Sequence, residues 1–259
     1  MACTSSDWLT LREIGWRATV AAVSDLAAMA AAPLGMLVAL VLPELDAARV
    51  GELADGIGEA ARHAQIPIVG GDLSRGDLLS IGVTVIGSAP SPVSRRGARN
   101  GDLIYVTGRL GGPGAALRAF QLGVSPEHEY RERFARPVPR LAEGQWLARA
   151  GARALIDVSD GLASEVRHLA AASDVQIEID LDRLPALRSV TPDQAALSGE
   201  EYELLAAAPS LDVESFERAF GIPLTAIGRV TEGKGGAPVT FTRGGRRVDL
   251  ASGYEHFSS

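Results

Sequence analysis

Three short acidic segments carry the side chains best suited to chemistry in this sequence: Ser24-Asp25, Gly70-Gly71-Asp72 and Asp157-Val158-Ser159-Asp160-Gly161. Each places a carboxylate where burial would be costly without a partner. Mg²⁺ prefers oxygen ligands and often joins one or two carboxylates to phosphate oxygens, so these segments together favour binding of a Mg²⁺-bridged polyphosphate. Simpler readings stay open for each: an arginine partner for Asp25, a turn role for Asp72, and helix capping by Asp157 or Asp160.

Two further segments are candidates, and two classes of site are excluded. Ser198–Glu203 is an acidic turn before an apolar run, and Gly253–Phe257 clusters aromatic side chains that could stack on a planar ring or pack onto the core. Lys234 is the only lysine, so a lysine-centred phosphate loop is excluded. No histidine accompanies a recognisable Ser or Cys nucleophile, and we assign no catalytic residue.

Composition restricts the class of protein. The 259 residues are 46% hydrophobic and 22% charged, as expected for a globular chain with one large or two smaller domains. A net charge of -7 argues against a nucleic-acid partner. The single cysteine, Cys3, cannot form an internal disulfide, which favours the cytoplasm. The apolar stretch Val20–Leu42 contains Asp25 and Pro33, so we expect no membrane span.

The elements that must position these residues alternate between helix and strand, which predicts an α/β fold. Thr10 and Glu13 have capping-box spacing, so a helix should begin near Leu11. The expected elements that follow are a buried strand at Met36–Leu42, a helix at Leu45–His63, a strand at Ile66–Val69 ending in the Gly70-Gly71-Asp72 turn, and a strand at Ser80–Ile86. A linker-like segment, Ser88–Asp102, then separates two predicted domains, 1–92 and 93–259.

The second half predicts an α/β layer structure. We expect strands at Leu103–Thr107, Ala154–Ile156, Gln176–Ile179, Glu203–Ala207 and Leu224–Val230, and helices at Ala115–Leu122, Arg140–Ala150, Pro192–Leu197 and Val213–Phe220. A helix of about three turns should follow Gly161 directly. A hairpin should close the domain around Gly244-Gly245.

Seven segments, taken in order, resemble one known family. They are VSDLAAM (Val23–Met29), IVGGDLSRG (Ile68–Gly76), SRRGARNGDLIYVTG (Ser94–Gly108), RPVPR (Arg136–Arg140), IDVSDGL (Ile156–Leu162), SGEEYELL (Ser198–Leu205) and GYEHF (Gly253–Phe257). In order and spacing they resemble the thiamine-monophosphate kinases of the aminoimidazole ribonucleotide synthetase-like superfamily. The resemblance implies an N-terminal α+β domain that pairs across a homodimer into a β-barrel, with a C-terminal α/β domain beside it.

The resemblance also implies an activity and a site. The family transfers the γ-phosphoryl group of ATP to thiamine monophosphate with Mg²⁺, giving thiamine diphosphate and ADP. The positions that match family metal ligands are Asp25, Asp72, Asp157 and Asp160; those that match nucleotide contacts are Gly71, Asp72, Arg95 and Ser159; those that match thiamine monophosphate contacts are Glu200 and Tyr254. Glu200 would face the pyrimidine and Tyr254 would stack on the substrate.

One departure from the family concerns the beginning of the chain. Family members open with strands that carry a glycine followed by paired aspartates, and later a Ser/Thr-Asp element followed by a histidine, and this sequence contains neither. We therefore expect an N-terminally shortened member of the family. The alternative to an active kinase is a truncated or weakened homologue that binds nucleotide or thiamine phosphate without turnover.

Overall fold

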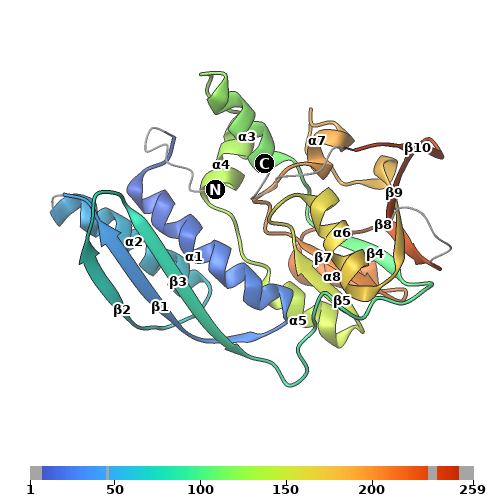
Figure 1. Cartoon of the computed structure of the whole chain (residues 1–259), viewed down its shortest axis with the longest axis horizontal. Coiled ribbons are helices and arrows are strands. Elements are labelled where there is room, and N and C mark those ends of the chain that lie inside the picture. The colour runs from blue at the N-terminus through green and yellow to red at the C-terminus, as the bar shows by residue number, and fades with distance from the viewer. Residues whose placement is uncertain (1–7, 45–46, 233–237, 251–259) are drawn as a thin grey trace.

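The computed structural model describes residues 8–44, 47–232 and 238–250 and consists of two β-sheets with helices packed on them. A three-stranded sheet belongs to the first half of the chain and a seven-stranded sheet to the second (Figure 1). The α/β class predicted from the sequence is confirmed. Within the described residues, no helix combines the length and apolar character needed to cross a membrane.

The first half packs two helices on one face of its sheet. Its elements are α1 (Leu11–Ala28), β1 (Ala32–Leu42), α2 (Ala47–His63), β2 (Ile68–Arg75) and β3 (Ser80–Ser88). The sheet order is β2-β1-β3, with β2 parallel and β3 antiparallel to β1. The predicted capping box of α1 is present, since the side chains of Thr10 and Glu13 each accept a backbone N–H of the other residue. Figure 1 shows α1 between this sheet and the second half of the chain.

Two predictions for this sheet were wrong. Strand β1 begins at Ala32, earlier than expected, and only Gly35 and Met36 are buried in it, because α1 and α2 cover one face only. The Gly70-Gly71-Asp72 segment is not a turn but the middle of β2, whose residues are all exposed. A Cβ at position 71 would lie 1.9 Å from the Val38 carbonyl oxygen, so the glycine is required for β2 to pair closely with β1.

The second half forms a mixed sheet of order β10-β9-β6-β8-β4-β7-β5, in which only the β6–β9 pair is parallel. Its strands are β4 (Leu103–Thr107), β5 (Ala154–Asp157), β6 (Gln176–Asp180), β7 (Leu204–Ala208), β8 (Leu224–Thr231), β9 (Val239–Arg243) and β10 (Arg246–Val248). Its helices are α3 (Gly112–Gln121), α4 (His128–Ala135), α5 (Leu141–Arg149), α6 (Leu162–Ser173), α7 (Pro192–Ala196) and α8 (Val213–Phe220), with a 3₁₀ turn at Leu181–Arg183.

Only α4 lacks a counterpart among the helices predicted for this half. Half of its sequence, HEYRERFA, is charged, and it buries Tyr130 and Phe134, which are four residues apart on one face, together with Ala135. Two such aromatics in eight residues are too few to set a helical period from sequence alone.

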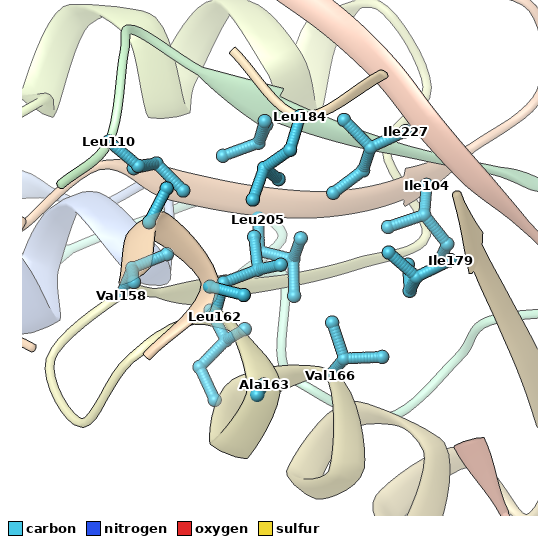
Figure 2. Packing of buried hydrophobic residues seen from close by; sticks show 14 of the residues in the cluster. Ile104, Leu110, Val158, Leu162, Ala163, Val166, Ile179, Leu184, Leu205 and Ile227 are labelled. Carbon is cyan, nitrogen blue, oxygen red and sulfur yellow. The ribbon is translucent and has the colours of Figure 1, made fainter. Parts of the chain in front are cut away.

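The largest core cluster lies between the seven-stranded sheet and α6. Figure 2 shows Leu162 and Val166 of α6 directed toward Leu205 and Ile104 of the sheet, with Val158 beside them. Val158 and Leu162 are fully buried. Because these two residues flank the Ser159-Asp160-Gly161 turn, the core fixes that turn from both ends.

Candidate active site

Helix α1 brings the first acidic segment to the third. Ser24 is fully buried, and its hydroxyl donates a hydrogen bond of 2.6 Å to Oδ2 of Asp157 at the end of β5. Asp25, the next residue on α1, lies close enough for its negative charge to act on Asp157. Two of the predicted metal ligands, from opposite halves of the chain, are therefore neighbours.

The electrostatics of this pair favour a cation. Burial raises the pKa of Asp157 to about 6, the charge of Asp25 adds to the rise, and the Ser24 hydrogen bond opposes it. Partial burial also raises the pKa of Asp25, and the positive charge of Arg95, in the segment between β3 and β4, partly offsets that rise. Arg95, expected to contact ATP, thus lies near Asp25.

The third acidic segment is hydrogen-bonded along its backbone to the Ser198–Glu203 turn. The Ser159 carbonyl accepts the Glu200 N–H at 2.7 Å, and the Val158 carbonyl accepts the N–H groups of Glu201 and Tyr202 at 3.1 and 3.0 Å. Glu200 and Tyr202 have positive φ angles of 59° and 53°, which non-glycine residues seldom adopt. These bonds hold the turn in that conformation and place the predicted metal and substrate segments side by side.

A buried carboxylate supports the same turn from behind. Oε1 of Glu165 accepts a hydrogen bond from the Asp160 N–H at 3.1 Å and from the Ser159 hydroxyl at 3.3 Å. Its Oε2 lies 3.1 Å from Nδ1 of His168, one turn further along α6. The sequence reasoning missed Glu165. The available signal was a glutamate three residues before a histidine on the helix that follows the acidic turn.

Glu200, the predicted pyrimidine contact, is paired with an arginine that the sequence reasoning also missed. Nη2 of Arg17 on α1 lies 2.7 Å from Glu200 Oε1. The Arg17 guanidinium also donates to the Phe134 carbonyl and lies 4.2 Å from the centre of the Phe134 ring. Arg17 is buried and anchored on α4, so it fixes the direction of the partly exposed Glu200 carboxylate.

The neighbouring Tyr202 is a further missed residue. Its ring is 8% exposed, and burial, reinforced by the charge of Glu200, raises the pKa of its hydroxyl. The charges of Asp157 and Asp160 act in the same direction. The phenol therefore stays neutral among the carboxylates of the site.

The rest of the Ser198–Glu203 turn holds the scaffold. Arg140, from the RPVPR segment, donates to both carboxylate oxygens of the buried Glu203 at 2.6 and 2.9 Å. Oε1 of Glu201 accepts the Gly111 N–H at 2.6 Å, and burial raises the pKa of Glu201 to about 8. Two of the three glutamates are thus structural, and Glu200 alone reaches the surface of the turn.

Asp72 is not brought to this group. It is exposed on β2, and its Oδ2 accepts a hydrogen bond of 2.6 Å from the Ser74 hydroxyl. Asp72 belongs to the three-stranded sheet of the first half, whereas Asp157 and Asp160 belong to the second half of the chain. Because Asp72 is exposed, the expected cost of burying a carboxylate does not arise there. Tyr254 lies outside the described residues.

The oxygen donors around Asp157 suit a hard cation. Burial raises the pKa of Asp157, and the negative charge of the exposed Asp25 raises it further. A divalent ion relieves that repulsion and takes carboxylate ligands. No three His, Cys, Asp or Glu side chains in the described ranges already converge to metal-ligand distance.

Comparisons with known proteins agree with this arrangement. Residues 1–89 match the family described as AIR synthase related protein, N-terminal domain, and residues 99–240 match its C-terminal domain. The thiamine-monophosphate kinase of Methanopyrus kandleri is 39% identical over 236 residues, which cover 86% of this chain and 74% of that protein.

Two solved structures are similar over nearly the whole chain. The crystal structure of thiamine-monophosphate kinase from Stenotrophomonas maltophilia K279a has a TM-score of 0.85 and 33% identity, covering 96% of this chain and 83% of the other. The structure of AaThiL complexed with AMPPCP and TMP has a TM-score of 0.83 and 30% identity, with coverages of 96% and 81%. The chain therefore belongs to the AIR synthase related proteins and, among them, to the thiamine-monophosphate kinase family.

Proposed function

We propose that this chain transfers the γ-phosphoryl group of ATP to the phosphate of thiamine monophosphate in a Mg²⁺-dependent reaction, giving thiamine diphosphate and ADP. The observation that carries the proposal is the hydrogen bond from Ser24 to the buried Asp157, which brings Asp25 of α1 toward the end of β5, with Arg95 near Asp25. An acidic pair with an adjacent arginine suits a metal-bridged polyphosphate. The named kinase relatives and the relative solved with AMPPCP and TMP support the same chemistry.

In this proposal the carboxylates of Asp25, Asp157, Asp160 and Asp72 hold Mg²⁺, which neutralises charge between the two anionic reactants. Arg95, Ser159 and the Gly71-Asp72 backbone contact the nucleotide. Asp72 would contribute to the metal and nucleotide site from β2, on the three-stranded sheet. Its exposure leaves its second carboxylate oxygen available for a ligand.

Recognition of the acceptor falls to Glu200, with Tyr254 stacking on it. Arg17 lies 2.7 Å from one oxygen of Glu200 and directs the carboxylate. An ionised carboxylate accepts the N–H of an aminopyrimidine. Thiamine monophosphate contains that group, whereas acceptors without it lose this hydrogen bond.

The reaction needs no protein base in this scheme. The attacking atom is an oxygen of a phosphate, which is already ionised at neutral pH. Catalysis then consists of alignment of two anions and stabilisation of charge. This agrees with the lack of any assigned nucleophile or base in the sequence.

We also propose that the chain has two domains, 1–92 and 93–259, and acts in the cytoplasm, where ATP is the common phosphoryl donor. We further propose that it forms a homodimer through the three-stranded sheet. Leu37, Ile68 and Leu73 are 40%, 49% and 66% exposed on β1 and β2. Exposed apolar side chains on a sheet with an open edge are typical of an interface. Light scattering coupled to size-exclusion chromatography measures the mass directly, and a monomer at micromolar concentration contradicts this part of the proposal.

The activity is tested by incubating the chain with Mg²⁺-ATP and thiamine monophosphate and measuring thiamine diphosphate by chromatography. We expect product with the wild-type chain and a loss of at least about 100-fold for Asp157→Asn. The matched control is Asp174→Asn, which makes the same charge change at the exposed, left-handed C-cap of α6, where asparagine is tolerated.

Three results would separate the alternatives. Product from thiamine monophosphate but not from unphosphorylated thiamine supports the kinase. Calorimetric binding of Mg²⁺-AMPPCP without product identifies a binding homologue. Absence of both binding and product overturns the proposal.

A further inference from the structure

We propose that Glu165 is a positioning residue for the nucleotide and metal site, acting through Ser159 and Asp160 rather than by touching a ligand. The inference rests on the proposed function, because it concerns how the Asp157–Gly161 turn is presented to Mg²⁺-ATP. Glu165 matches none of the site residues expected from the family resemblance. It enters through three contacts with the turn and α6.

Glu165 lies in the first turn of α6 and its side chain is 3% exposed, so it faces the interior side of the acidic turn and not the solvent. A buried carboxylate needs hydrogen-bond donors. Glu165 has three: the Ser159 hydroxyl, the Asp160 N–H and the His168 ring nitrogen.

The hydrogen bonds from Ser159 and Asp160 to Glu165 fix the conformation of the turn. The Ser159 hydroxyl and the Asp160 N–H both donate to the same oxygen, Oε1, so one carboxylate atom fixes a side chain and the adjacent peptide. Fixing that peptide also fixes the direction in which the Asp160 side chain leaves the backbone. Because the Ser159 hydroxyl proton is committed to Glu165, Ser159 Oγ offers only acceptor capacity to a ligand.

The second carboxylate oxygen of Glu165, Oε2, contacts His168. Oε2 lies 3.1 Å from His168 Nδ1, and the His168 side chain is half exposed. The histidine holds the second oxygen, so the carboxylate cannot rotate away from the turn without losing that contact. Glu165 therefore bridges α6 and the turn as a rigid support, and turn residues positioned to within about 0.5 Å are what tight metal and phosphate binding requires.

A simpler role for Glu165 is capping of α6, since a glutamate in the first turn that accepts a backbone N–H stabilises the helix start. A cap affects stability but not ligand affinity. The positioning role requires that removal of the carboxylate weaken Mg²⁺-AMPPCP binding in protein that remains folded. The two roles therefore differ in a measurable quantity.

The experiment measures Mg²⁺-AMPPCP binding by titration calorimetry and folding by circular dichroism for wild type, Glu165→Ala and Glu165→Gln. We expect the dissociation constant to rise at least about tenfold for Glu165→Ala, the size of one lost hydrogen bond to a charged group. Glu165→Gln retains a carbonyl oxygen that can accept both donors, so its dissociation constant should stay within about threefold of wild type.

Two controls isolate the effect. Glu143→Ala removes another buried helical glutamate, whose carboxylate lies 3.3 Å from Arg140 on α5's own N-cap, and should lower the melting temperature without changing affinity. In a Ser159→Ala background, Glu165→Ala should cost less affinity than in wild type, because the two residues act as one unit.

The outcomes separate this inference from the proposed function. Wild-type affinity in folded Glu165→Ala overturns the positioning role even if the wild-type chain makes thiamine diphosphate. Weakened binding in Glu165→Ala with rescue in Glu165→Gln supports it, even if the wild-type chain binds Mg²⁺-AMPPCP and makes no product. Failure of the wild-type chain to bind Mg²⁺-AMPPCP overturns both.

Discussion

Asp157→Asn should make the ligand-free protein more stable while removing its response to Mg²⁺. Asp157 is buried, 7% exposed, and its pKa rises from 3.8 to about 6 because the ionised form has lost water and lies near Asp25. A rise of about two pKa units corresponds to about 3 kcal/mol of free energy by which ionised Asp157 opposes folding. Asparagine removes that charge and can still accept the hydrogen bond from Ser24.

The sign of the effect fixes its pH dependence. A folded-state pKa above the unfolded value means that the folded protein binds the extra proton between pH 3.8 and about 6, so wild-type stability falls as pH rises through that range. The advantage of Asp157→Asn should therefore be near zero at pH 4, grow through pH 5 and reach its full value of about 3 kcal/mol above pH 7. For a chain of this length the melting temperature should rise by about 6–12 °C.

The assay is thermal unfolding in EDTA at pH 4.5 and pH 8, then at pH 8 with Mg²⁺ and AMPPCP. We expect wild type to gain stability from the ligands and Asp157→Asn to gain little, since ligand stabilisation scales with affinity. Asp174→Asn, at the exposed end of α6, should behave as wild type in every condition. An equal stability change for Asp157→Asn at the two pH values, or a loss at pH 8, would refute the electrostatic reasoning.

Three shorter predictions test other parts of the structure. Gly71→Ala should destabilise the protein by about 1–3 kcal/mol in urea unfolding because the new Cβ would lie 1.9 Å from a β1 carbonyl oxygen, whereas Gly82→Ala on β3, with its nearest contact at 3.7 Å, should be neutral or slightly stabilising. Burial raises the pKa of Glu201 from 4.5 to about 8, so the free energy of unfolding of the wild type should fall as the pH rises through this interval. Glu201→Gln should remove this part of the fall, and an unchanged pH profile contradicts the assignment. Arg17→Met should raise KM for thiamine monophosphate about tenfold with KM for ATP unchanged, because Glu200 loses its ion pair with Arg17. Equal changes in both constants would argue against a role in acceptor binding.

Local signals in the sequence were enough for many elements. Strand β4 and helix α8 have the predicted bounds, Leu103–Thr107 and Val213–Phe220, and α1 begins at the predicted capping box. These elements carry their own caps and apolar period, so neighbouring segments need not be known. The Gly70-Gly71 pair misled the reasoning because glycine is typical both of turns and of strands that approach a neighbouring backbone closely, and only the pairing with β1 distinguishes the two.

Some residues of the candidate site could likewise be predicted from the sequence, and others could not. The segments around Asp25, Asp157 and Asp160 could be singled out from the sequence because a carboxylate in an apolar helix or in a turn before a helix forms a recognisable pattern, and their role as metal ligands stays a prediction. Arg17, which pairs with Glu200, and Glu165, which supports Ser159 and Asp160, were missed because their partners lie on other elements or depend on the path of the turn. Arginines and glutamates are common on helices, and burial against a functional turn can be read only once the elements are packed.

Helix α1 contributes side chains both to the candidate site and to the contact between the two halves of the chain. Arg17 and Ser24 point from one helix to two different segments of the second half, the Glu200 turn and the end of β5. Trp16, beside Arg17, donates from its ring N–H to the Pro137 carbonyl at 2.8 Å. A movement of α1 against the seven-stranded sheet would therefore shift the acceptor contact and the acidic pair together. Tight packing of this helix is thus a condition for aligning the two reactants, which the proposed reaction depends on in place of a catalytic base.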